Sequence, residues 1–268
     1  MAFRLREKDG LLYHTSDVLG VGISHAFTTR LGGVSPAPYD ALNLRFSCDD
    51  ARQNVEENYR RLTAALGIPY ERGVSTHQLH HDHIRLVTEE DAGKGFVRPR
   101  DYDDTDALIT AVPRIPLYVF SAYCGITLLH DPVHRAVGAV HSGWRGVALG
   151  ILPKAIRRME AEFGTEAVDL RVAIGAGIRS CCFETDDDVS DALCAAYGDA
   201  FLPYRERRGE KWHIDLAGLN ICALRSLGIP EAQIDLLPDC TCCDPRLYWS
   251  HRRDGNARGV QAAVISLL

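Results

Sequence analysis

Four of the eleven histidines in this chain fall within seven consecutive positions, from His77 to His83. Buried imidazole nitrogens need hydrogen-bond partners, so rings this close together seldom arise from packing alone. An extended backbone would place His81 and His83 on one face of the segment and His80 on the other. The cluster therefore favours a metal site with at least one histidine ligand from this segment, with a solvated polar turn as the alternative.

Two further segments place a metal ligand or a reactive group beside glycines. Cys124 lies between two apolar runs and is followed by Gly125, which lets another group approach closely. His141 ends an apolar run that passes through Gly143 into a helical pattern. The backbone N–H groups of such a turn point outward at a helix N-terminus, and with Arg145 beside them they are typical of an anion site. Taken alone, Cys124 is more often a buried thiol than a ligand.

The remaining cysteines do not show a recognised metal-binding spacing. The chain has nine cysteines, and this odd number together with its length favours reduced thiols over a disulfide framework. The run Cys240-Thr241-Cys242-Cys243 lacks the C-x₂-C spacing of structural zinc sites, and the adjacent pair Cys181-Cys182 suits a zinc knuckle poorly. The sequence therefore does not favour a second metal. Arg252 and Arg253 suit bidentate contact with a phosphate or carboxylate, with a solvated face as the alternative.

The elements that must position these residues are short strands and a few helices. Runs of β type are predicted at Val21–Arg30, Ile84–Thr88, Ala107–Thr110, Leu117–Tyr123, Ile126–His130, Ala136–Ser142, Leu170–Ile174 and Val260–Leu268. Helical spacing and end signals predict helices over residues 49–66, capped by Asp49-Asp50, and over 147–163, 187–197 and 216–227. Strands and helices mix without regular βαβ alternation, which favours an α+β fold over a doubly wound one.

Composition and charge limit the classes of protein. Apolar residues make up 46% of the 268 positions and charged residues 25%, so the chain is globular and long enough for a full core. The net charge is −6 with no dense basic block, which argues against nucleic acid or an anionic membrane as the main partner. No run approaches the roughly 20 apolar residues that span a bilayer, and the first residues lack a signal-peptide core. A cytoplasmic protein is predicted.

Taken in order, several motifs resemble the laccase-domain proteins, once labelled multicopper polyphenol oxidases and also called the purine nucleoside phosphorylase-like multifunctional family. The resemblance covers roughly residues 20–268, and the matching stretches are Ala26–Ser35, Leu42–Leu44, Gln78–His80, Thr105–Leu108, the Cys124 segment, Val140–Gly146, Ile178–Glu184, Cys240-Thr241 and Ser250–Gly255. Three positions depart from the family pattern, where Tyr123, His81 and His251 replace a usual Asp, Gly and Tyr.

The resemblance implies a structure and a ligand set. It implies a single layered domain over residues 1–268, an α/β/β/α sandwich with mixed sheets. It also implies a zinc ion bound by two histidines and a cysteine, which correspond to His80, Cys124 and His141. These three residues are the predicted catalytic and metal-binding residues, in a monomer or small homo-oligomer.

The resemblance further implies phosphorolysis of adenosine, inosine, guanosine and methylthioadenosine to base and ribose 1-phosphate, with adenosine deamination. A His₂Cys set with an open fourth position fits catalytic zinc, which activates water and so suits deamination. Phosphorolysis requires groups that hold phosphate against the ribose. The substrate- and phosphate-binding candidates are Arg30, Asn43, Arg145, Arg252 and Arg253. The sequence does not identify the group that protonates the leaving base.

Three alternatives stay open. His₂Cys is also a copper arrangement, but Met1 and Met159 lie far from the motifs and His81-x-His83 is the one His-x-His pair, so a copper-dependent polyphenol oxidase is disfavoured. A Cys–His hydrolase would use Cys124 as nucleophile and His80 or His141 as base on an amide such as a peptidoglycan precursor. The non-enzymatic alternative is a metal-binding interaction module.

Overall fold

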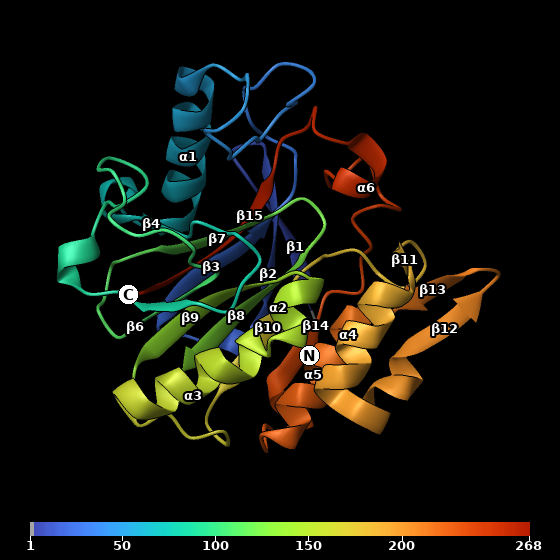
Figure 1. Cartoon of the computed structure of the whole chain (residues 1–268). Coiled ribbons are helices and arrows are strands. Elements are labelled where there is room, and N and C mark those ends of the chain that lie inside the picture. Colours follow the sequence, from blue (N-terminus) through green and yellow to red (C-terminus); the bar gives the residue numbers. More distant parts are fainter. Residues whose placement is uncertain (1–2) are drawn as a thin grey trace.

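Two six-stranded sheets lie face to face in this computed structural model, which describes residues 3–268 (Figure 1). The first sheet has the order β1 (Phe3–Lys8), β2 (Leu11–Ser16), β3 (Ile23–Thr28), β15 (Gln261–Leu267), β7 (Leu117–Ser121) and β4 (Val74–Ser75). The second has the order β14 (Ile234–Leu236), β10 (Arg171–Ile174), β8 (Gly125–Asp131), β9 (Ala136–Ser142), β6 (Ala107–Thr110) and β5 (Ile84–Leu86). A smaller sheet has the order β11 (Glu184–Thr185), β13 (Lys211–Ile214) and β12 (Arg205–Arg208).

Both large sheets are mixed. The pairs β4–β7, β5–β6 and β10–β14 are parallel, and the other neighbours in these sheets are antiparallel. No regular βαβ units are present in the described residues, and most neighbouring strands are antiparallel. The predicted α+β class with mixed sheets is confirmed.

The apolar residues of the central strands pack on two faces because side chains alternate along a strand. In β15, Ala263 and Ile265 point into the layer between the sheets, where they share a core with Ile126 of β8. Ala262 and Val264 of the same strand point outward into a second core. A strand that is buried on both faces has a continuous run of apolar residues, and for this reason the sequence predicts a strand at Val260–Leu268.

Helices cover the outer face of each sheet. Helix α1 (Arg52–Leu66) packs Val55, Tyr59 and Leu62 on the first sheet. Helices α3 (Ile151–Phe163) and α5 (Leu216–Ser226) pack on the second, through residues such as Ile156 and Leu224. Figure 1 shows α1 on one side of the paired sheets and α3 and α5 on the other. The layers therefore run α/β/β/α, as the family resemblance implied.

The helix predicted over residues 147–163 is two helices. Helix α2 (Trp144–Ala148) ends before Gly150, whose φ of +72° is the left-handed conformation that glycine adopts readily, and α3 follows. Pro153 lies in the first turn of α3, where a missing N–H costs nothing. Helix α4 (Asp187–Tyr197) has the predicted bounds.

The capping role predicted for Asp49-Asp50 is wrong. Helix α1 begins at Arg52, two residues later than Asp50. The Asp50 carboxylate instead accepts hydrogen bonds from Ser35 Oγ at 2.6 Å and Asn43 Nδ2 at 2.9 Å, because these buried groups need an acceptor. Within residues 3–268, no helix combines the length and apolar character that a membrane crossing requires.

Candidate metal centre

Cys124 lies in the short connection that passes from the first sheet to the second, between β7 and β8. Two backbone oxygens of this turn accept hydrogen bonds from residues outside it. Ser121 Oγ donates to Cys124 O at 2.6 Å, and the Ile178 N–H donates to Tyr123 O at 2.6 Å. The thiol is 7% exposed and therefore sits at a fixed, nearly buried position between the sheets.

His141 lies near the end of β9 and is oriented by Asp106. Its Nδ1 lies 2.7 Å from Asp106 Oδ1, and both side chains are buried. A carboxylate only accepts, so Nδ1 carries a proton, and Nε2 is the ring nitrogen that can bind a metal once it is deprotonated. A second hydrogen bond, from His141 N–H to Asp106 O at 2.9 Å, fixes the backbone.

Asp106 also shapes the turn that carries His80. Its carboxylate accepts the backbone N–H groups of Leu79 at 3.0 Å, His80 at 3.2 Å and His81 at 3.3 Å. His80 has a φ of +66°, a conformation that is uncommon for a residue other than glycine. The convergent hydrogen bonds on one carboxylate offset this strain, and strained residues held in this way cluster at functional sites.

The three predicted ligands come together from these separate elements. One donor atom from each of His80, Cys124 and His141 lies within 4.8 Å of the other two. The imidazole rings meet edge to face, with centroids 5.0 Å apart. Gly143 borders the cluster, and a Cβ there would lie 2.9 Å from His80 Cδ2 and 3.1 Å from Cys124 Sγ. Glycine is therefore required at this position.

The electrostatics of the cluster favour a thiolate beside a protonated imidazole. Burial alone would raise the pKa of Cys124, but the neighbouring His141 and His80 lower it. Burial alone would lower the pKa of His141, but Cys124 and the Asp106 carboxylate raise it. Each partner stabilises the charged form of the other in a site from which water is largely excluded.

This donor set fits a metal ion. A thiolate and two imidazoles are ligands that zinc prefers, and Asp106 supplies the carboxylate partner that metal-binding histidines usually have. Asp106 was within a quoted motif but had no role assigned from the sequence, because the pairing with His141 depends on the register of β6 and β9. Metal binding by the three residues stays a prediction that this geometry supports.

Two aspartates bind the other histidines of the cluster. His77 Nδ1 lies 3.0 Å from Asp103, and His81 Nδ1 lies 2.8 Å from Asp104. His83 Nδ1 lies 3.0 Å from the same Asp104 carboxylate. These three histidines are partly or largely exposed and are not among the grouped ligands. Their density in the sequence thus reflects contacts with these aspartates as well as the candidate centre.

Three of the predicted substrate- and phosphate-binding residues use their side chains in hydrogen bonds to other parts of the chain. Arg30 and Arg253 donate to backbone carbonyl groups; their acceptors are Asp40 O, Pro245 O, Thr241 O, Cys242 O and Tyr248 O. Asn43 is 0% exposed and binds the Asp50 carboxylate. Their side chains act on loop conformation, and phosphate binding by them stays untested.

Arg145 and Arg252 are exposed and lie beside Tyr123, the residue before Cys124. Burial raises the pKa of the Tyr123 hydroxyl, as does Cys124, whereas the charges of Arg252, Arg145 and Arg258 lower it. Arg258 had no signal in the sequence. Its Nε is buried without a hydrogen-bond partner in the described part of the chain. Since α2 has only five residues, its dipole contributes less to an anion site than the long helix predicted.

A cleft of about 860 Å³ is lined by residues 75–78, just before His80 in the chain. Its cationic and aromatic lining includes Arg45, Arg52, Arg98, Arg100, Phe46 and Phe120. The candidate ligands do not line the cleft, but Gln78 does and is two residues from His80. Burial and then the charge of Arg45 lower the pKa of Arg258, whereas Cys124 raises it. The volume suits a ligand of nucleoside size.

Fold and site together define a class: an α/β/β/α sandwich with a buried His₂Cys cluster at the crossing between its sheets. The chain belongs to the multi-copper polyphenol oxidoreductase laccase family, whose model matches residues 24–268. The family predicted from the sequence motifs is thereby confirmed.

Similar proteins match along nearly the whole chain. A purine nucleoside phosphorylase of Deinococcus radiodurans is 34% identical, over 92% of this chain and 90% of its own length. The purine nucleoside phosphorylase YlmD of Geobacillus stearothermophilus is 33% identical, over 91% and 90% of the two chains. The crystal structure of YlmD from Geobacillus stearothermophilus has a TM-score of 0.91 at 32% identity, covering 99% of this chain and 98% of that one. The hypothetical protein YfiH of Bacillus licheniformis also has a TM-score of 0.91, at 30% identity and 99% coverage of both chains.

Proposed function

We propose that this chain is a zinc-dependent purine nucleoside phosphorylase. The proposed substrates are adenosine, inosine, guanosine and methylthioadenosine, which phosphate splits into the base and ribose 1-phosphate or its methylthio analogue. Adenosine deamination is proposed as a second activity of the same centre. The observation that carries the proposal is the similarity, over about nine-tenths of the chain, to proteins named purine nucleoside phosphorylase.

His80, Cys124 and His141 would hold the zinc ion. Zinc with three protein ligands supplies a Lewis acid with an open coordination position. Asp106 keeps the proton of His141 on Nδ1 and so presents Nε2 to the metal. Copper accepts the same donors, but Met159, the one methionine within residues 3–268, lies on the buried face of α3 and offers no axial thioether. Zinc is therefore the proposed metal.

Phosphate needs guanidinium N–H groups that are not all engaged, and Arg252 uses Nη1 on Cys182 O at 3.2 Å but keeps its other donors. Arg145 and Arg252 are the exposed members of the predicted set, and both lie near Tyr123. Arg258, with its unpartnered Nε, lies beside the same tyrosine and the thiol. These three guanidinium groups are proposed to hold phosphate beside the centre. Arg30, Asn43 and Arg253 are proposed to position the loops around them.

The test is incubation of zinc-loaded protein with adenosine, with and without phosphate, followed by separation of adenine from inosine. Phosphorolysis predicts adenine and ribose 1-phosphate only when phosphate is present. Deamination predicts inosine under both conditions. If neither product forms at any zinc loading, the proposed function is wrong.

A second candidate is a thiol hydrolase, and the position of Cys124 Sγ within 4.8 Å of a His141 ring nitrogen favours it. A low thiol pKa beside an imidazole is the arrangement that activates a nucleophilic cysteine, with an amide such as a peptidoglycan precursor as substrate. Zinc occupying the thiolate would block this reaction. Hydrolysis of such an amide by metal-free protein, abolished by iodoacetamide and by zinc, would support the hydrolase and contradict the zinc enzyme.

A further inference from the structure

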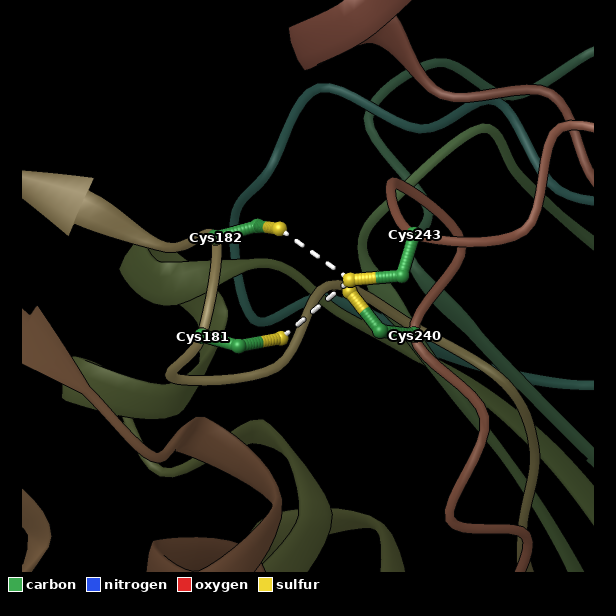
Figure 2. A group of neighbouring side chains, drawn as sticks. All are labelled: Cys181, Cys182, Cys240 and Cys243. Carbon is green, nitrogen blue, oxygen red and sulfur yellow. Dashed lines mark hydrogen bonds between the residues drawn. The ribbon is translucent and has the colours of Figure 1, made fainter.

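Four cysteines outside the candidate centre converge on one point at the edge of the molecule. Cys181 and Cys182 lie in the loop before β11, and Cys240 and Cys243 lie in the loop after β14. Figure 2 shows the two pairs pointing toward one another from opposite sides of a gap. The second pair follows the first by about sixty residues, so the spacing of the cysteines along the sequence does not predict that the four lie together.

The sulfur positions match the ligand shell of a tetrahedral metal. Cys243 Sγ lies 3.5 Å from Cys181 Sγ and 3.4 Å from Cys182 Sγ, and all four sulfurs lie within 4.8 Å of one another. A zinc ion with four Zn–S bonds of about 2.3 Å has sulfur atoms roughly 3.8 Å apart, at the corners of a tetrahedron. The cysteines are free, so all four sulfurs are available as ligands.

We infer that Cys181, Cys182, Cys240 and Cys243 form a structural zinc site, separate from the centre at His80, Cys124 and His141. Four thiolates fill the tetrahedral shell and leave no open position, which is typical of a structural rather than a catalytic zinc ion. The proposal does not rest on the proposed function.

The surroundings are those of a built thiolate site. Cys240 is the buried member of the group, and its Sγ accepts the backbone N–H of Arg179 at 3.4 Å. The Arg179 side chain is mostly buried, and its Nη2 donates to Gly175 O at 2.9 Å and to Leu237 O, which fixes the backbone beside Cys240. A backbone N–H group that donates to a sulfur stabilises its negative charge, and tetrahedral sulfur sets select zinc or iron. Zinc is the redox-inert choice for a surface loop.

A zinc ion here would join two loops that flank Cys124. Thr241 N–H donates to Gly177 O at 3.1 Å, and Ile178 N–H donates to Tyr123 O at 2.6 Å, so the cysteine loops and the Cys124 turn are linked by backbone hydrogen bonds. Arg252, one of the proposed phosphate ligands, donates to Cys182 O at 3.2 Å. A zinc ion at this site would therefore stabilise the loop to which Arg252 is hydrogen-bonded.

The experiment counts zinc in protein whose candidate centre has been disabled. Cys124→Ser protein, purified under reducing conditions, is expected to keep one zinc per chain by mass spectrometry of the metal. Adding Cys181→Ser and Cys243→Ser is expected to remove that zinc and lower Tm. The matched control adds Cys194→Ser and Cys222→Ser, two cysteines on α4 and α5 outside the group, and is expected to keep it.

Wild-type protein gives a test that does not depend on the variants folding. Cobalt in place of zinc is expected to give the intense sulfur-to-metal bands of a tetrahedral tetrathiolate. Peptide mapping after alkylation is expected to show these four cysteines protected only in the metal-bound protein. Four alkylated cysteines in metal-loaded protein, a disulfide within the group under reducing purification, or iron in place of zinc would each overturn the assignment.

Discussion

Asp106, which had no role assigned from the sequence, contacts two of the three segments that form the candidate centre. Its carboxylate binds His141 Nδ1 at 2.7 Å and also accepts the backbone N–H groups of the His80 turn. One side chain therefore fixes both the ring orientation of one ligand and the backbone of another.

Replacing Asp106 with Asn should weaken metal binding while the ligands stay in place. The amide cannot offer the same negative charge to His141 or accept as strongly from the backbone. Loss of such a carboxylate partner typically lowers metal affinity about 10- to 100-fold. Competition with a zinc chelator would measure the change. The matched control is Asp103→Asn, which alters an exposed carboxylate bound to His77, and is expected to leave the affinity unchanged.

Arg145→Ala should weaken phosphate binding and leave the zinc content unchanged. A charge-assisted hydrogen bond contributes about 1.5–3 kcal/mol, so KM for phosphate should rise roughly 10- to 100-fold. Arg157→Ala on the exposed face of α3 is the control and should leave KM at the wild-type value. An unchanged KM in Arg145→Ala would remove this residue from the proposed phosphate site.

The grouping of His80, Cys124 and His141 was implied by the family resemblance, whereas residue types alone favoured only a histidine ligand from residues 77–83. Asp106 and Arg258 could not be predicted, because their importance comes from contacts across the fold. Arg252 and Arg253 are the paired cations of the sequence, yet Arg253, like Arg30, donates its N–H groups to backbone carbonyl oxygens. The sequence shows that a side chain is charged but not whether its donors are already engaged.

At the scale of elements, the sequence predicts most of the strands and helices that have a buried face, but it misses β2 (Leu11–Ser16), whose side chains are mostly buried. The apolar runs of β8, β9 and β15 and helices α4 and α5 lie close to their predicted bounds. Strands β1 and β12 gave no signal, because Phe3–Lys8 and Arg205–Arg208 are charged and largely exposed at sheet edges. Their pairing is set by tertiary position rather than by hydrophobic alternation.

The short helical turn Glu89–Asp91 contains a buried carboxylate, that of Asp91, which accepts several hydrogen bonds. Burial would raise the pKa of Asp91, but hydrogen bonds from Arg85, Lys94 and the Thr88 N–H lower it to about 2. A carboxylate with a depressed pKa stabilises the fold above its unfolded pKa of about 4 and loses that contribution as pH falls toward 2. The contribution at neutral pH is about 2 kcal/mol.

Asp91→Asn should therefore lower the free energy of unfolding at pH 7 by about 3 kcal/mol, because it also leaves Lys94 without its buried partner. The difference from wild type should shrink as pH falls from 4 to 2. Urea denaturation at several pH values measures both effects. Glu90→Gln, at the exposed neighbouring position, should change neither. A pH-independent difference for Asp91→Asn would contradict the assigned role.

At the scale of the whole molecule, the site exists because the chain crosses between two sheets. Cys124 is held at that crossing, His141 comes from β9 of one sheet and His80 from a loop leaving the other. The layer order could be inferred from the family resemblance, whereas spacing alone indicated only an α+β class. The meeting of Cys181-Cys182 with Cys240 and Cys243 depends on the same packing and could not be read from spacing.

The most direct test of the central claim is a zinc titration of metal-free protein, with phosphate-dependent release of adenine from adenosine as the readout. The titration should be run in wild type and in Cys124→Ser. The account predicts that activity in wild type rises in proportion to zinc bound at His80, Cys124 and His141, and stays absent in Cys124→Ser at saturating zinc. Full activity in the metal-free protein, or in Cys124→Ser, would contradict it.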